Sequence, residues 1–529
     1  MFYNMEKKDY KAMPILKQKA FEDCKNVFFV DRDYNLANSK LVVPKGITID
    51  FKGGSINNGT LSCNDNLLEN LSSGCIDTRI EGTIQNDVIY SSHITSINNL
   101  ALTNYSGMTI NFDHDETITN SIVIHSANSS TNTSTVFDGM EHSFSCATTF
   151  FILEYSSKNV TIKNFRATAQ DTAGYIDFEK MNSSVGVTNI VVKDNIISRF
   201  SVGISINGDD DGYQVTNCRV EGNTIGNAVG TDSGHGYGIH LANARNCVIT
   251  RNHISSCERH SIYHAYGQNN EISHNTIVSH RVNQTSDLST RAALEIVRKS
   301  TDISVSHNSF YNSYNVSILV YAFPHSFDDS SASYFSDKYG CCERITITGN
   351  DFYSTNFTNN LGGLPAIRLG YIYDPSIIHY SQFATCHVKD VVIRANTFKR
   401  INSAAIKCIS IDQCLHPLIL NNTFEFDAQV TSSSSDLIEI HPQFKNDENM
   451  QVSILSNTFK ATGYIPQNSI FCLGNLANVN NSLFNITFTS NSFVNQSTSS
   501  GTHLNFRQYK PVGITSSAGT NLHLQAEVI

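Results

Sequence analysis

A phrase of alternating apolar and polar residues recurs along this chain, and each copy ends two residues after an asparagine. Four copies show the pattern: Ile190–Ile197, Cys247–Ile254, Ile303–Phe310 and Ile345–Phe352. The marker asparagines are Asn164, Asn195, Asn223, Asn252, Asn275, Asn308, Asn350, Asn396, Asn422, Asn457 and Asn491. Positions three and five residues before the asparagine, and two residues after it, are mostly apolar. Because side chains alternate across a strand, these positions share one inward face.

The repeat predicts a solenoid in which each copy forms part of one coil. The shortest interval, from Asn252 to Asn275, is 23 residues, and this length fits one turn of a parallel β-helix. Stacked coils would place like residues about 4.8 Å apart. We expect each asparagine to lie at a bend in the left-handed conformation, with its amide bonded to the next coil.

The pattern resembles the right-handed parallel β-helix of the pectate-lyase-like superfamily over about residues 40–500. The segment Leu41–Ile56 also resembles the first coil of bacterial polysaccharide-degrading members. We therefore expect an all-β chain that folds as a right-handed parallel β-helix, a solenoid, with a short N-terminal capping helix. Apolar residues at 16, 20 and 24 place this helix over Pro14–Cys24, where it covers the open sheet edge.

The expected domain organisation follows the extent of the repeat. Residues 1–40 form an N-terminal cap segment, and residues 41–500 form the β-helix with loop insertions near 320–345 and 352–366. Residues 501–529 form a C-terminal cap or tail. In solenoids, such insertions form loops on one face, which is commonly the binding face.

Composition narrows the function classes. Hydrophobic residues make up 40% and charged residues 16% of the chain, which is apolar enough to exclude disorder. No apolar stretch reaches the length of a membrane span, and the net charge of −10 argues against nucleic-acid binding. The 13 cysteines form no CxxC pair and are expected to be small buried hydrophobes.

The N-terminus lacks the apolar region of a signal peptide. The chain is therefore either cytoplasmic or a mature form, and we expect a secreted, periplasmic or cell-surface protein that acts as a monomer.

A second strand precedes each asparagine phrase, and its third position is predicted to point outward to solvent. The residues that flank this position are apolar, as in Gly238–Leu241 and Ser261–His264. The predicted outward column consists of Ser205, His240, Tyr263, Glu295, Leu319, Arg368, Lys407 and Glu439. An ordinary solvated face would carry Ser, Thr and Asn, whereas this column gathers ionisable and aromatic side chains on neighbouring coils.

The resemblance implies chemistry on this column. Polysaccharide lyases of this fold remove the C5 proton of a uronic acid, expel the 4-linked sugar and neutralise the C6 carboxylate. His or Tyr can transfer the protons, and Arg, Lys or a cation can hold the carboxylate. The catalytic candidates are His240 as base and Tyr263 as acid or second base, with Arg259, His260, His264 and Lys299. The substrate-binding candidates are Arg291, Glu295, Arg298, Arg368, Lys407 and His235.

Several of these candidates have more specific expected roles. Arg259, Arg291 and Lys299 are expected to hold a carboxylate or sulfate. His260 and His264 are alternates, because a one-residue slip changes which of them points outward.

Two local resemblances leave alternatives. Glu295–Ser300 resembles the segment of alginate and chondroitin lyases that supplies a calcium ligand, here Glu295, and a base, here Lys299, with an interval one residue shorter. We expect no metal and no cofactor, with calcium as the alternative. Gly234–Gly236, preceded by Asp209–Asp211, resembles polygalacturonase-type hydrolases, although the acidic run falls in a predicted turn and hydrolysis needs paired carboxylates.

The predicted partner is an anionic polysaccharide. A glycosaminoglycan of the chondroitin, dermatan or hyaluronan type is the first choice, followed by alginate or pectin. The alternatives to a lyase are a polygalacturonase-like hydrolase and a non-catalytic glycan-binding, tailspike-like solenoid. Tyr321, Tyr371 and Tyr373 could be sugar platforms in such a binder or, equally, beside an active site.

Overall fold

A computed structural model describes most of the chain. The described residues are 10–102, 107–124, 134–153, 157–170, 177–181, 187–208, 215–230, 234–278, 292–311, 316–321, 342–355, 365–370, 388–403, 407–412, 414–428, 437–440, 449–461, 471–473, 483–495 and 521–526. They fall into two compact units: unit 1 spans Met1–Ile197 with Asn217–Arg219, and unit 2 spans Ser198–Thr216 with Val220–Ile529. Most of both predicted insertions, and the predicted sugar platforms Tyr371 and Tyr373, lie outside the described residues.

Unit 1 begins with one short helix and a small parallel sheet. Helix α1 (Gln18–Glu22) buries Phe21, and the Gln18 side chain exchanges two hydrogen bonds with the backbone of Val42. The sheet comprises β1 (Val27–Val30), β2 (Tyr34–Asn35), β3 (Lys40–Val42), β4 (Thr48–Phe51), β5 (Ile56–Glu69), β6 (Ile76–Ile84) and β8 (Leu100–Leu102). The helix is shorter than predicted, and strands already occur before residue 41.

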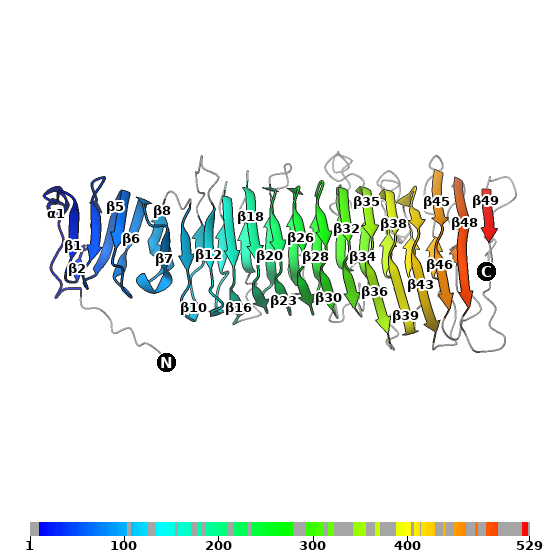
Figure 1. Ribbon diagram of the computed structural model, residues 1–529, viewed down its shortest axis with the longest axis horizontal. Helices are drawn as coiled ribbons and strands as arrows, with labels where there is room; N and C mark the ends of the chain where they lie inside the picture. The colour runs from blue at the N-terminus through cyan, green and yellow to red at the C-terminus, as the bar shows by residue number, and fades with distance from the viewer. Residues whose placement is uncertain are drawn as a thin grey trace, which may run out of the picture. The chain divides into compact units, whose positions relative to one another are not determined.

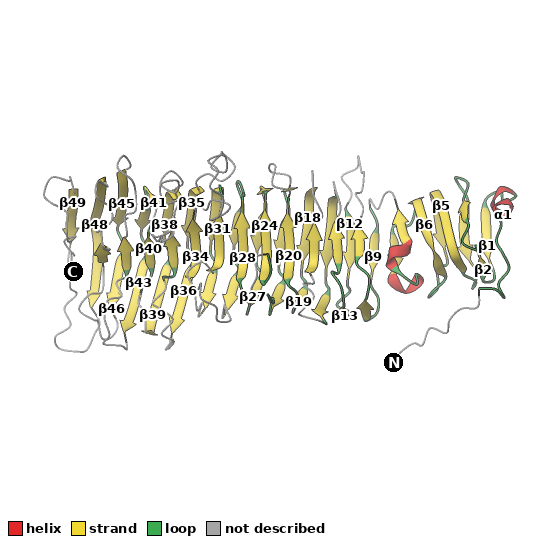
Figure 2. Cartoon of the chain, turned by 180° about the vertical axis from the view of Figure 1, so that it is seen from behind, coloured by secondary structure: helices red, strands yellow, loops and turns green. Residues whose placement is uncertain are grey.

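The rest of unit 1 is coiled from three runs of parallel strands. Two 3-10 helices, η1 (Ser91–His93) and η2 (Ile97–Asn99), follow its first strand (Figure 2). One run holds β7 (Val88–Tyr90), β9 (Thr109–Asn111), β12 (Thr135–Asp138), β15 (Lys158–Lys163) and β18 (Val187–Lys193). The second holds β10 (Glu116–Ile118), β13 (Ser143–Cys146), β16 (Arg166–Ala169) and β19 (Ile196–Ser198), and the third holds β11 (Ile122–Ile124), β14 (Phe151–Leu153) and β17 (Asp177–Met181).

Each coil of unit 2 passes through three strand positions, visible as repeated arrows from green to red in Figure 1. The first position, here called the column sheet, holds β20 (Val202–Asn207), β24 (Tyr237–Ala242), β28 (His260–Ala265), β31 (Ala292–Val297), β34 (Val316–Tyr321), β37 (Ile367–Leu369), β40 (Ile409–Ile411), β44 (Ile438–Ile440) and β47 (Phe471–Leu473).

The second and third positions flank the asparagines. The strands before the asparagines are β21 (Val215–Thr216), β22 (Arg219–Glu221), β25 (Ala244–Arg245), β26 (Val248–Thr250), β29 (Glu271–Ser273), β32 (Thr301–Ser306), β35 (Cys342–Thr348), β38 (Val388–Arg394), β41 (Cys414–Leu415), β42 (Leu418–Leu420), β45 (Asn449–Leu455) and β48 (Leu483–Asn495). After the last asparagine, β49 (Asn521–Ala526) pairs with β48. The strands after them are β23 (Thr224–Gly226), β27 (His253–Ser255), β30 (Thr276–Val278), β33 (Ser309–Tyr311), β36 (Asp351–Thr355), β39 (Thr397–Ser403), β43 (Thr423–Ala428) and β46 (Thr458–Ala461), and β48 continues past Asn491.

The marker asparagines of unit 2 form an unbroken hydrogen-bonded row from Asn223 to Asn491. The Oδ1 atom of Asn308 accepts from the backbone N–H and the Nδ2 of Asn275, at 2.9 Å each. Its Nδ2 donates to the carbonyl of Ile272 at 2.8 Å. The same links join each marker asparagine of this unit to the next. The amide bonding to the next coil is therefore confirmed.

The predicted conformation of these asparagines was wrong. The left-handed residue is the one before the asparagine, such as His274, His307 or Ser456, because the buried asparagine needs its own backbone N–H for the next coil. Asn164 is also one residue out of register. Its φ is 59°, and the N–H of the following Phe165 donates to Asn195.

The predicted inward positions are confirmed as the core. Ile249 and Ile254 are buried, as are the equivalent residues of the other coils. Two residues after each later asparagine, phenylalanine rings stack at 4.8–5.1 Å between centroids, over Phe310, Phe352, Phe398, Phe424 and Phe459. The cysteines in the described part are free thiols, and Cys218 and Cys247 are buried, as expected of small hydrophobes.

Candidate functional site

The column sheet aligns the predicted column over six rungs, from β20 to β37. The register pairs Ser205 with His240, His240 with Tyr263 and Tyr263 with Glu295. Glu295 then pairs with Leu319, and Leu319 with Arg368. This part of the column has the predicted order, with neighbouring rungs about 4.8 Å apart.

The next rung differs from the prediction. Arg368 pairs with Ser410, and Ser410 pairs with Glu439, so Lys407 is not a member of the column. The apolar residues that flank the column position in this strand are Ile409 and Ile411, whereas the prediction used Ile406 and Cys408. The residue in the column is therefore Ser410, three residues after Lys407. The Lys407 ammonium still reaches this row, because its Nζ lies 2.6 Å from Oε2 of Glu439.

Arg368 and Lys407, both predicted to bind substrate, are held in ion pairs. Nε of Arg368 lies 2.7 Å from Oδ2 of Asp412, and both side chains are buried. Ser410 donates a hydrogen bond to the other oxygen of Asp412. Neither cation forms a contact with His240 or Tyr263. Their ion pairs give both of them a structural role.

The prediction that the column faces solvent was wrong at its centre. Glu295 is only 3% exposed, while His240 and Tyr263 are half-buried. Around them the outer side of the sheet is apolar, since Tyr263 packs on a cluster that includes Leu319 and Tyr321. The sequence pattern distinguishes inward from outward positions, but it does not reveal what covers an outward one.

Four rings from two adjacent rungs form a compact cluster, here called the ring cluster: Tyr237, His240, His260 and Tyr263. The rings of Tyr237 and Tyr263 are parallel, with centroids 5.2 Å apart. The His240 ring lies 5.3 Å from Tyr263 and 5.5 Å from Tyr237. The guanidinium carbon of Arg259 lies 5.6 Å from the Tyr237 centroid, within range of a cation–π contact.

Behind the ring cluster, Glu295 joins β28, β31 and β34. Its Oε1 accepts a hydrogen bond from the Tyr321 hydroxyl at 2.9 Å, and its Oε2 lies 3.2 Å from Nε2 of His260. Nδ1 of His260 lies 2.9 Å from the carbonyl of Ala292. All four groups are buried.

This geometry defines the protonation of the pair formed by His260 and Glu295. The Ala292 carbonyl only accepts, so Nδ1 of His260 carries a hydrogen. Nε2 of His260 then presents a lone pair 3.2 Å from Oε2 of Glu295, an oxygen that has no hydrogen-bond partner in the described part of the chain. A proton held by the pair avoids the approach of two lone pairs. Burial raises the pKa of Glu295 to about 7, against the opposing effects of the Tyr321 hydrogen bond and of the nearby arginines. The pair can thus retain its proton at neutral pH.

Burial also sets the protonation of His240 and Tyr263. It lowers the pKa of His240 to about 4, and the charge of Arg298 acts in the same direction. It raises the pKa of the Tyr263 phenol well above 10, with Arg298 opposing and Glu295 assisting. At neutral pH, His240 is a neutral imidazole and Tyr263 a neutral phenol.

Two arginines supply positive charge beside these groups. The Nε atoms of Arg259 and Arg298 are buried, and within the described part of the chain neither has a hydrogen-bond acceptor. Arg298 and Lys299 follow β31 directly, with φ values of 58° and 48°, and the guanidinium of Arg298 lies over the Tyr266 ring. Arg291 lies outside the described residues, as do Asp209–Asp211.

His264 and His235 lie apart from the ring cluster. His264 is fully buried, with Nδ1 3.1 Å from the Ser300 hydroxyl and Nε2 3.0 Å from Nδ2 of Asn270. Its ring therefore links Asn270, in the connection from β28 to β29, to Ser300, in the turn after β31. Nδ1 of His235 is 2.8 Å from the Ser201 hydroxyl.

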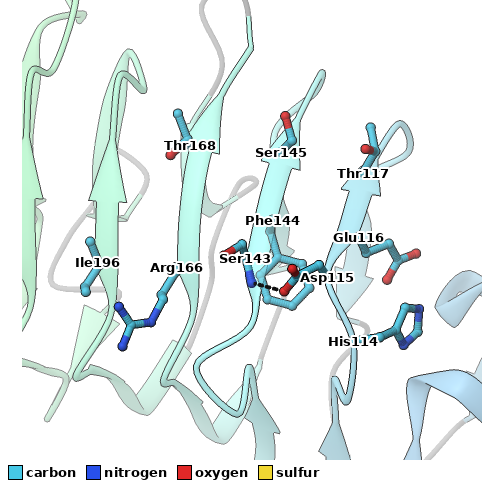
Figure 3. Close-up of a pocket in the computed structure, with 10 residues that line it drawn as sticks. All are labelled: His114, Asp115, Glu116, Thr117, Ser143, Phe144, Ser145, Arg166, Thr168 and Ile196. Atoms are coloured by element: carbon cyan, nitrogen blue, oxygen red, sulfur yellow. Dashed lines mark hydrogen bonds between the residues drawn. The ribbon is translucent and has the colours of Figure 1, made fainter. Parts of the chain in front are cut away.

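A pocket among the described residues lies outside the column. It lies in unit 1 and has a volume of about 780 Å³ (Figure 3). Across the described ranges, no group of three or more His, Cys, Asp or Glu side chains is placed to hold a metal ion. Within the same ranges, no helix is long and apolar enough to cross a membrane.

Comparison with known families identifies the architecture. Residues 183–328 match the family described as the right handed beta helix region, and the rungs with the ring cluster fall inside this range. The chain folds as a right-handed parallel β-helix. No curated protein matches it.

Several solved structures resemble this β-helix. The catalytic domain of a GH87 alpha-1,3-glucanase in complex with nigerose is 12% identical, with 73% of this chain and 64% of that domain covered and a TM-score of 0.47. The chain thus spans less than two thirds of the glucanase domain. The periplasmic alginate epimerase AlgG is 9% identical over 70% of this chain and 77% of its own, with a TM-score of 0.42. PfbA, a surface adhesin of Streptococcus pneumoniae, is 14% identical over 75% and 82%, with a TM-score of 0.35.

Two residues of the β-helix site were missed as members of the cluster. Tyr237 stands three residues before His240, as His260 stands three residues before Tyr263. This equal spacing in the two strands could have predicted that Tyr237 lies beside His260. Tyr321 was expected only as a sugar platform, but its hydroxyl donates to Glu295. It lies two residues after Leu319 of the column, and therefore on the same face of its strand.

Proposed function

We propose that this β-helix is a polysaccharide lyase that cleaves uronic-acid chains by β-elimination at the ring cluster. The observation that carries the proposal is the pairing of His240 with Tyr263 on adjacent rungs, beside Arg259 and Arg298. A proton acceptor, a proton donor and positive charge are the three functions that the reaction needs.

His240 is the base. As a neutral imidazole it accepts the C5 proton of the uronate, and the electron pair of that C–H bond forms the C4–C5 double bond. The bond from C4 to the glycosidic oxygen breaks, and Tyr263 donates its phenolic proton to that oxygen. One proton is taken and one is given, so the two side chains return to their starting states by exchange with water.

The arginines stabilise the negative charge that develops on the uronate carboxylate when C5 loses its proton. Such preorganised charge is strongest in a site with little water. The buried Nε atoms of Arg259 and Arg298 are donors without an acceptor, and the substrate carboxylate would supply one. Lys299, next to Arg298 in sequence, is a further candidate to hold this carboxylate.

The pair formed by His260 and Glu295 positions the ring cluster. Its single retained proton keeps net charge away from the back of Tyr237 and Tyr263, whose rings lie 5.2 and 5.5 Å from the His260 ring. A bare Glu295 carboxylate there would raise the pKa of Tyr263 further and would compete with the substrate for the arginines.

The preferred substrates are anionic polysaccharides that contain uronic acid, because positive charge next to a base suits a carboxylate at C6. Glycosaminoglycans of the chondroitin, dermatan or hyaluronan type come first, and alginate and pectic chains follow. Such substrates are extracellular, so the enzyme would act outside the cytoplasm.

One observation favours hydrolysis as a second candidate. Glu295, with its pKa raised to about 7, has the property of a general acid in glycosidases. Hydrolysis also needs a second carboxyl group about 5–10 Å away. No carboxyl group of the described residues forms an ion pair with Arg259 or Arg298, so these charges remain available to a substrate carboxylate, and this makes elimination the better candidate.

The test is a panel of uronic-acid polysaccharides read by ultraviolet absorbance. Chondroitin, dermatan, hyaluronan, alginate and pectate are each incubated with the protein, and the absorbance of the unsaturated uronate is followed together with reducing ends. A lyase increases both signals. Reducing ends without absorbance would indicate a hydrolase, and neither signal on any member would contradict both activities.

A further inference from the structure

The pocket of unit 1 is independent of the ring cluster and takes no part in the proposed elimination. It lies against β10, β13, β16 and β19 and is lined by His114, Asp115, Glu116, Thr117, Ser143, Phe144, Ser145, Arg166, Thr168 and Ile196. Its volume of about 780 Å³ lies within the range of small-molecule sites. Figure 3 shows the acidic residues and His114 at one end, and Arg166 with Ile196 at the other.

Glu116 is the most informative residue of this pocket. Its side chain is half-buried, and it has no hydrogen-bond or ion-pair partner among the residues that the structure describes. Burial raises the pKa of this carboxyl, with the neighbouring His114 opposing. A carboxyl that loses water without gaining a protein partner is costly, and a ligand that donates hydrogen bonds would remove that cost.

Asp115 offers a second, oriented acceptor. Its Oδ1 accepts from the backbone N–H of Ser143 at 2.8 Å, the dashed line in Figure 3, and lies 3.3 Å from Nδ1 of His142. Its Oδ2 has no partner among the described residues. These contacts hold the pKa of Asp115 below its usual value, so this carboxylate is ionised and fixed at neutral pH.

Hydroxyl groups continue the polar surface along the strands. Thr117 pairs in register with Ser145, and Ser145 with Thr168, so three hydroxyls follow one another over about 10 Å. Arg166 adds a donor on the neighbouring row and is bonded through one nitrogen to Glu141. Ile196, 43% exposed, provides apolar surface at the same end.

We propose that this pocket binds a neutral oligosaccharide. Sugar hydroxyls donate to Asp115 and Glu116 and exchange hydrogen bonds with the hydroxyl row, and a sugar C–H face covers Ile196. The extended row matches a chain of linked sugars better than a single one. A uronate or sulfate would meet the two carboxyl groups and be repelled, so the ligand differs from the proposed substrate of the ring cluster.

Binding is tested by calorimetry with the full-length protein and defined hexasaccharides. The neutral probes are gluco-, galacto- and mannohexaose, the anionic probe is a chondroitin hexasaccharide, and the cationic probe is a chitosan hexamer. We expect at least one neutral probe to bind. Glu116→Ala should weaken it by roughly tenfold or more, as expected for loss of a hydrogen bond to a charged group.

Two control variants separate this site from general effects. Glu69→Ala removes an exposed carboxylate of β5 in the same unit, outside the pocket, and should leave the affinity unchanged. His240→Ala should also leave it unchanged, which separates this proposal from the lyase activity. The proposal is overturned if no neutral probe binds, if Glu116→Ala behaves like Glu69→Ala, or if only the charged probes bind in a Glu116-dependent way.

Discussion

Tyr237 is the residue on which the arrangement of the ring cluster depends. Its ring is parallel to that of Tyr263, lies 5.5 Å from His240 and 5.2 Å from His260, and carries the Arg259 guanidinium on its face. The two proposed proton-transfer groups therefore share one packing partner. A substitution at Tyr237 should disturb both, whereas changes at His240 and Tyr263 can be made separately.

The proposed base and acid make the most direct prediction at this scale. His240→Ala and Tyr263→Phe should each lower turnover by about 10²- to 10⁴-fold, since each removes one proton transfer. Tyr263→Phe keeps the ring and its packing, so its melting temperature should stay close to that of the parent. Initial rates of absorbance increase on the best substrate measure the effect.

His253→Ala is the matched control for these variants, because His253 is an exposed histidine on β27. It should retain full activity. Near-normal rates in both His240→Ala and Tyr263→Phe would remove the ring cluster from consideration as the catalytic site.

Glu295 makes a pH-dependent prediction. Its pKa rises from 4.5 to about 7 on folding, so between these pH values the folded protein binds more protons than the unfolded chain. Stability from this group is present below pH 4.5 and is lost as the pH rises through about 7. Glu295→Gln cannot titrate and should lack this decline, which melting temperatures of both proteins from pH 4.5 to 8 would reveal.

The activity profile distinguishes a positioning role of Glu295 from a purely structural one. Glu295→Gln keeps the size of the side chain and leaves the pair uncharged at every pH, so the alkaline limb of the rate profile should move to higher pH. An unchanged profile together with an unchanged stability curve would contradict the shared proton.

At the scale of the elements, the asparagine row helps to determine how each coil stacks on the next. Asn308→Ala leaves two buried donors of Asn275 without their acceptor, and each such loss costs about 1–3 kcal/mol. We expect a destabilisation of about 2–4 kcal/mol, measured by denaturant unfolding. Ser309→Ala, at the next residue, should cost far less, and equal losses in the two variants would refute the importance of the row.

The same elements show what could be predicted from sequence. The inward positions and the order of the column from Ser205 to Arg368 follow from alternation, because each strand has one clear apolar pair. At β40 two apolar pairs compete, Ile406 with Cys408 and Ile409 with Ile411, and alternation alone selected the wrong one. The predicted conformation at the bend was wrong for another reason. Asparagine favours the left-handed conformation, but here the hydrogen bonds along the row determine its backbone conformation.

The candidate site was predictable in part of its membership, without Tyr237 and Tyr321, but not in its surroundings. His240, Tyr263, Arg259, His260, Glu295 and Arg298 do gather around one region of unit 2, as the register required. Their burial, the carbonyl of Ala292 behind His260 and the ion pair between Arg368 and Asp412 depend on contacts distant in sequence, which a repeat cannot encode.

At the scale of the whole molecule, one prediction concerns which group neutralises the substrate carboxylate. If Arg259 and Arg298 neutralise the uronate carboxylate, a chelator should leave the rate unchanged after extensive dialysis, and added calcium should not increase it. Arg298→Gln should then lower the rate with and without calcium. Loss of activity in chelator, restored by calcium, would instead favour the metal-dependent alternative for Glu295 and Lys299.

The asparagine row also bears on how such a chain can change over evolutionary time. Successive asparagines of unit 2 are separated by as few as 23 residues and as many as 46, between Asn350 and Asn396, yet every link from one to the next is made. Each coil can therefore lengthen or shorten between two fixed points without altering its neighbours. Insertions and deletions become local events, and a lineage can vary its loops while the rungs that carry the proposed catalytic groups keep their register.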